Sequence, residues 1–103
     1  MNVERIASLY ILFSGDTSDS TSLIREVVDS VIEELTSDAD QTDDRLTFYC
    51  AARANLRYFL LKMARGQINT DKLPLNTQIK LTEDLVKCYR CNIEEFFTDS
   101  SNN

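Results

Sequence analysis

Two groups of residues have the types and spacing that could support chemistry, and the first is a cysteine pair. Cys88 and Cys91 form a C-x-x-C pair, the spacing of thioredoxin-like redox sites and of zinc half-sites. A redox pair of this kind lies at a helix N-terminus, where the helix dipole lowers a thiol pKa. Here the pair falls in the second half of a predicted helix, and only Cys50 remains as a further ligand because the chain has no His. We therefore expect structural thiols, one in the core and one near the surface, and no metal.

The second group is a run of aspartates in a polar stretch, Asp38, Asp40, Asp43 and Asp44. The run lacks the Gly at the sharp turn and the closing Glu that an EF-hand calcium loop needs. Helix capping and solvation explain these carboxylates more simply. No phosphate-binding Gly loop, G-x-S-x-G or dinucleotide fingerprint occurs, and the lack of His removes the commonest general base. We expect no catalytic residue and no cofactor.

Length, charge and cysteine count narrow the class of protein further. The chain has 103 residues, enough for one domain, and a formal net charge of −6. That negative charge argues against nucleic-acid binding by a globally basic surface, although it is compatible with a local basic face. The odd count of three Cys implies no closed disulfide framework and fits a reducing compartment. The longest apolar run, residues 6–13, is too short to span a bilayer. We therefore expect no signal peptide, no membrane contact and a location in the cytoplasm of the producing cell.

The elements that must position these residues are predicted to be helices. With two Gly and one Pro, the chain has few of the residues that form the turns between short strands. Apolar residues recur at helical spacing over about 3–13, 22–35, 43–65 and 77–97. Residues 67–76 show no helical period and contain Pro74, which indicates an irregular, extended or hairpin segment. We expect an all-α single domain over residues 1–97, about four helices around one core, and a disordered polar tail at 98–103. The predicted core consists of Ile24, Val27, Val31, Phe48, Leu56, Phe59, Leu60, Leu81, Leu85 and Phe96.

Charge is distributed unevenly along the chain. Residues 1–44 carry eleven acids and two bases, residues 45–90 nine bases and three acids, and residues 91–103 three acids, which gives −9, +6 and −3. Three interpretations stay open: neutralisation of the acidic and basic blocks within one monomer, head-to-tail assembly of copies, and phosphate contact by the basic face. The candidate inter-subunit contacts are the basic Arg53, Arg57, Lys62 and Arg65 and the acidic Asp38, Asp40, Asp43 and Asp44.

The order of these segments resembles the small head–tail connector (adaptor) proteins of tailed phages and prophages. The likeness lies in a short first helix, a second helix over residues 23–35 (LIREVVDSVIEEL), an acidic loop, and residues 43–58 (DDRLTFYCAARANLRY). Connectors of this kind continue with a short extended segment and a final helix, as residues 68–97 do here. The extended segment departs from the connector pattern, because residues 69–74 (NTDKLP) lack its alternation and its Gly-Asp turns.

The resemblance implies a structural protein and no enzyme. Copies would form a ring oligomer that bridges the portal to the tail, so the partners would be further copies and portal or tail proteins, and the location would include the virion. Ala51, Ala52, Ala54 and Tyr58 would be helix-packing positions, and Arg53 and Arg57 inter-subunit contacts. The alternative is a small cytosolic helical module that binds a partner protein without a phage role.

Overall fold

A computed structural model describes residues 1–16 and 20–97, and helices dominate that part of the chain. In order they are α1 (Val3–Ser14), α2 (Thr21–Glu34), α3 (Asp44–Ala64) and α4 (Leu75–Cys91), followed by a short 3₁₀ turn, η1 (Glu94–Phe96). The described residues form no strand; their only β contact is an isolated antiparallel bridge between Leu35 and Phe97. The all-α prediction is confirmed. The tail predicted at 98–103 lies outside the described residues.

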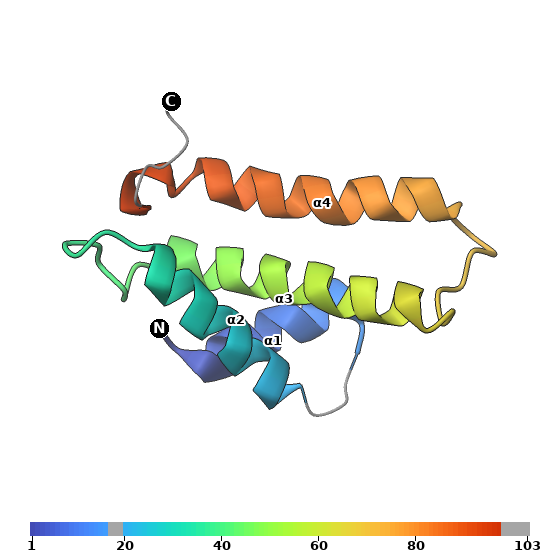
Figure 1. Ribbon diagram of the computed structural model, residues 1–103, viewed down its shortest axis with the longest axis horizontal. Coiled ribbons are helices and arrows are strands. Elements are labelled where there is room, and N and C mark those ends of the chain that lie inside the picture. The colour runs from blue at the N-terminus through green and yellow to red at the C-terminus, as the bar shows by residue number, and fades with distance from the viewer. Residues whose placement is uncertain (17–19, 98–103) are drawn as a thin grey trace.

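α3 is the central helix, and every other helix packs against it. In Figure 1, α4 lies along one side of α3, while α1 and α2 lie on the other side. α3 begins at Asp43, whose carboxylate caps the helix by accepting from the backbone N–H of Arg45 at 2.9 Å. It ends where Gly66 takes a positive φ of 68°, a conformation that glycine adopts without strain.

The first two helices follow their sequence patterns closely. α1 is capped by Asn2, which accepts from Arg5 N–H at 3.2 Å, and it ends at Gly15 with φ 71°. α2 buries the predicted stripe at helical spacing, with Ile24, Val27, Val28 and Val31 inside.

The segment before α4 is irregular, and it forms no hairpin. Asn69 accepts from the backbone N–H of Asp71 through its side chain, at 2.8 Å. The Gln78 amide nitrogen, from the first turn of α4, donates to the backbone oxygens of Asn69 and Leu73, at 2.8 Å each. These bonds satisfy backbone groups without a strand partner, so the hairpin alternative is wrong.

The last helix is displaced from its predicted range of 77–97. It starts at Leu75, directly after the cap residue Pro74, because the first turn of a helix needs no N–H from proline. It ends at Cys91 because the chain then turns to bury Ile93 and Phe97. Backbone contacts fix this return: Thr36 N–H donates to Phe96 O at 2.8 Å, next to the Leu35–Phe97 bridge.

The core lies nearer the beginning of the chain than predicted. Ile24, Val27 and Val31 are buried as expected, but Leu60 and Leu81 are 44% and 54% exposed, and the other five predicted positions are half-buried. α1 packs against α3, and its Ile6 and Tyr10 share the core cluster with Ala51 and Ala54 of α3, so the interior is closed by residues outside the predicted set. These are Ile6, Tyr10, Val28, Leu46, Tyr49, Cys50, Ala51, Ala52, Ala54, Ile93 and Phe97.

Candidate protein-contact surface

The two arginines predicted as inter-subunit contacts point to acids of the same chain. Arg53 Nη1 lies 2.7 Å from Glu34 Oε2, and Arg57 forms an ion pair with Glu26. Arg53 also donates to Ser30 Oγ at 3.4 Å. Both guanidinium groups therefore hold α2 against α3.

Three of the four predicted aspartates have local partners. Asp43 caps α3 and forms an ion pair with Arg45 at 2.9 Å, and hydrogen bonds from Arg45 lower the pKa of the Asp43 carboxyl. Asp44 pairs with Arg5 at 2.8 Å. Asp40 accepts from the backbone N–H and the hydroxyl of Thr42, and these bonds lower its pKa. The fourth, Asp38, is exposed and has no ion pair within the described part of the chain.

Lys62 and Arg65 lie at the opposite end of α3, where the α3–α4 hairpin turns. Lys62 Nζ lies 5.2 Å from the centre of the Tyr58 ring, a cation–π contact. Arg65 is exposed just beyond the last residue of α3. Across the described residues neither side chain forms an ion pair. The structure therefore separates these two bases from Arg53 and Arg57, with which they were predicted to act.

Four leucines are exposed around this turn. The exposed fractions are 44% for Leu60 and 43% for Leu61 on α3, 43% for Leu73 in the connection, and 54% for Leu81 on α4. α4 buries no residue completely. In Figure 1, α3 and α4 extend along the long axis past the beginning of α2. We call this free end of the α3–α4 hairpin, with Leu60, Leu61, Lys62, Arg65, Lys72, Leu73 and Leu81, the hairpin tip.

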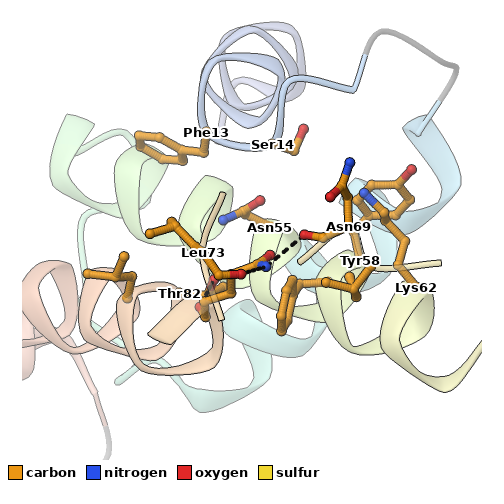
Figure 2. A pocket seen from close by; sticks show the side chains of 12 residues that line it. Phe13, Ser14, Asn55, Tyr58, Lys62, Asn69, Leu73 and Thr82 are labelled. Carbon is orange, nitrogen blue, oxygen red and sulfur yellow. Dashed lines mark hydrogen bonds between the residues drawn. The ribbon is translucent and has the colours of Figure 1, made fainter. Parts of the chain in front are cut away.

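A pocket of about 300 Å³ adjoins the hairpin tip, between the end of α1, α3, the connection and α4. Figure 2 shows Phe13 and Ser14 on the α1 side, with Tyr58 and Lys62 opposite them on α3. The lining mixes aromatic and aliphatic side chains with amides and hydroxyls, and among the described residues that line it the ionisable groups are Tyr58 and Lys62. Such a mixture of apolar surface and hydrogen-bonding groups is typical of protein contact surfaces.

The cysteine pair differs from its prediction. Cys88 and Cys91 are both exposed thiols on the last turns of α4, so neither is a core residue. The one buried thiol is Cys50, on the face of α3 that enters the core, and burial raises its pKa to about 12. Within the described ranges, no three His, Cys, Asp or Glu side chains gather closely enough to hold a metal ion.

Sequence reasoning missed the exposed leucines because it assigned Leu60 and Leu81 to the core. A signal was available in α3. Residues 56–63 (LRYFLLKM) place apolar side chains all around the helix, and one packed neighbour cannot cover all of them. This part of α3 therefore has more apolar faces than one neighbouring helix can bury.

Comparisons with family models, curated proteins and solved structures find no significant match. The connector resemblance therefore stays a prediction from sequence. A separate observation concerns membranes: of the helices in residues 1–16 and 20–97, none is both long and apolar enough to cross a bilayer.

Proposed function

We propose that this protein is a structural assembly protein of the head–tail connector kind, which acts through self-association and contact with portal or tail proteins. The observation that carries the proposal is the hairpin tip, where four leucines are 43–54% exposed and two of them, Leu73 and Leu81, line a pocket. Exposed apolar surface rimmed by polar residues marks protein interaction sites. The layout of helices that resembles phage connectors supports the same role. On this proposal the chain is no enzyme, and its places of action are the cytoplasm of the producing cell and the virion.

Mass measurement across protein concentration tests self-association. Size-exclusion chromatography with light scattering should give masses that are multiples of 11.8 kDa and rise with concentration. A suitable comparison is the double variant Leu60→Ser, Leu61→Ser, which removes two exposed leucines and should shift association to higher concentration. Its matched control is Leu12→Ser, because Leu12 is 74% exposed but lies on α1. A strictly monomeric mass at every concentration and salt level would overturn self-assembly.

The phage context has its own test in the genome. Flanking genes for portal, capsid and tail proteins are expected around this gene. A neighbourhood without virion genes would overturn the connector role and favour the alternative, a helical module that binds a partner protein outside any phage.

A further inference from the structure

We propose that copies of this chain join head to tail, with the hairpin tip of one copy seated on the acidic end of the next. The acidic end is defined by three exposed carboxylates, Glu33, Asp38 and Glu94. The inference rests on the proposed self-assembly and specifies which two surfaces meet.

The hairpin tip carries positive charge that the chain itself does not neutralise. Residues 57–80 contain five bases and one acid. Two of the bases are paired, Arg57 with Glu26 and Lys80 with Asp84. The remaining three, Lys62, Arg65 and Lys72, form no ion pair with any described residue. Lys62 lines the same pocket as Leu73 and Leu81.

The acidic end has the opposite surplus. Several of its carboxylates are already paired within the chain, as Glu34 is with Arg53 and Glu95 with Arg45. Glu33, Asp38 and Glu94 have no such partner among the residues described. They belong to one end of the molecule, because Thr36 N–H donates to Phe96 O at 2.8 Å and so joins the α2–α3 loop to η1. Ile32, 36% exposed, adds apolar surface beside Glu33.

The two surfaces cannot meet within one copy. The molecule is 45 Å long, and Figure 1 places the α2–α3 loop with η1 at one end of that axis and the α3–α4 turn at the other. Such a separation is several times the Debye length of about 8 Å at physiological salt, so the charges are screened from each other. The hairpin tip of one copy and the acidic end of a second copy can come into direct contact.

Charge also decides the symmetry of the contact. Two hairpin tips facing each other across a two-fold axis would bring together like charges, and so would two acidic ends, which opposes such pairing. A tip against an acidic end places bases opposite carboxylates and buries the leucines. The favoured contact is therefore heterologous, the type that builds rings or filaments.

Charge reversal at each end, followed by mixing, tests the proposal. The tip variant is Arg65→Glu with Lys72→Glu, and the acidic-end variant is Glu33→Lys with Asp38→Lys; all four side chains are exposed, so circular dichroism should show unchanged helicity. Each variant alone presents like charges at both ends and should associate more than roughly tenfold more weakly than the natural chain. An equimolar mixture should recover association, because each variant then supplies the complement of the other.

The matched control for the tip variant is Arg25→Glu with Lys87→Glu, which makes the same change of net charge as that variant at exposed positions outside both surfaces. It should associate like the natural chain. If the natural chain assembles and the two reversed variants assemble equally well, or if mixing restores nothing, head-to-tail docking is overturned while self-assembly stands. A monomeric natural chain would overturn both.

Discussion

The basic side chains along α3 differ in whether an acid of the same chain lies opposite them. Arg53 and Arg57 meet Glu34 and Glu26 on α2, so the internal neutralisation considered from the sequence accounts for these two. Lys62 and Arg65 lie further along the helix, and no described acid pairs with them. At the scale of the residue, the basic face of α3 is therefore two surfaces, one that holds α2 and one whose bases have no acidic partner among the described residues.

The three thiols should differ sharply in reactivity. Cys50 is fully buried and its pKa is raised to about 12 by burial, so at neutral pH it is a protonated thiol without access to reagent. Cys88 and Cys91 are exposed. Titration of the native protein with Ellman's reagent should modify two thiols quickly and the third only in denaturant. The variant Cys50→Ala should keep the two fast reactions and lack the third, which needs denaturant. A single rate for all three thiols of the natural chain would contradict the burial of Cys50.

The N-cap of α3 should make stability depend on pH in the acid range. Hydrogen bonds from Arg45 hold the folded-state pKa of Asp43 below its ordinary value of 3.8. A carboxyl with a lowered folded pKa contributes stability above its unfolded pKa, and the contribution is lost as pH falls through the folded pKa. The natural chain should therefore have a higher urea midpoint than Asp43→Asn at neutral pH.

That difference should shrink as pH falls through the lowered folded-state pKa of Asp43, because asparagine remains a good N-cap but does not titrate. The natural chain and the variant have every other acid in common, so the difference between their urea midpoints reports on the Asp43 carboxylate alone. A difference in midpoint that stays constant across the whole acid range would contradict the assignment.

At the scale of the element, the regular parts of the fold could be predicted and the packing partners could not. The α2 stripe from Ile24 to Val31 follows from helical spacing alone, because that helix has one apolar face. α3 has apolar side chains on several faces, so spacing could not tell which would be covered. The choice depended on α1, whose buried Ile6 and Tyr10 belong to the same core cluster as Ala51 and Ala54 of α3. Leu60 and Leu81 were misassigned for that reason, and the contact surface was missed with them.

Replacing a buried small residue of α3 with a larger one should destabilise the protein. Ala54 is fully buried in the core cluster, whereas Ala64, on the last turn of the same helix, is exposed. Ala54→Leu should lower the free energy of unfolding by about 1–3 kcal/mol through overpacking. Ala64→Leu changes the same atoms in the same helix and should stay within about 0.5 kcal/mol. Urea denaturation followed by circular dichroism measures both, and equal effects at the two sites would contradict the predicted difference in packing.

At the scale of the whole molecule, stability should fall from the core toward the hairpin tip. The buried side chains come from α1, α2, the first half of α3 and the return at Ile93 and Phe97, whereas α4 buries none completely. Segments with few buried contacts open locally at lower free energy than the global unfolding. In the monomeric tip variant, backbone amides of α4 and of residues 57–64 should therefore exchange with deuterium faster than those of residues 46–54.

Assembly should weaken this gradient, and that change connects stability to function. If the tip is seated on the acidic end of another copy, residues 57–64 and the first turns of α4 gain buried contacts in the natural chain at high concentration. Their exchange should slow relative to the tip variant, while the amides of residues 46–54 should keep the rates they have in the monomer. Slowing confined to α1 and α2 would contradict the tip as the contact surface, because those helices would then carry the interface. Hydrogen exchange thus reports the location of the contact independently of the measured mass.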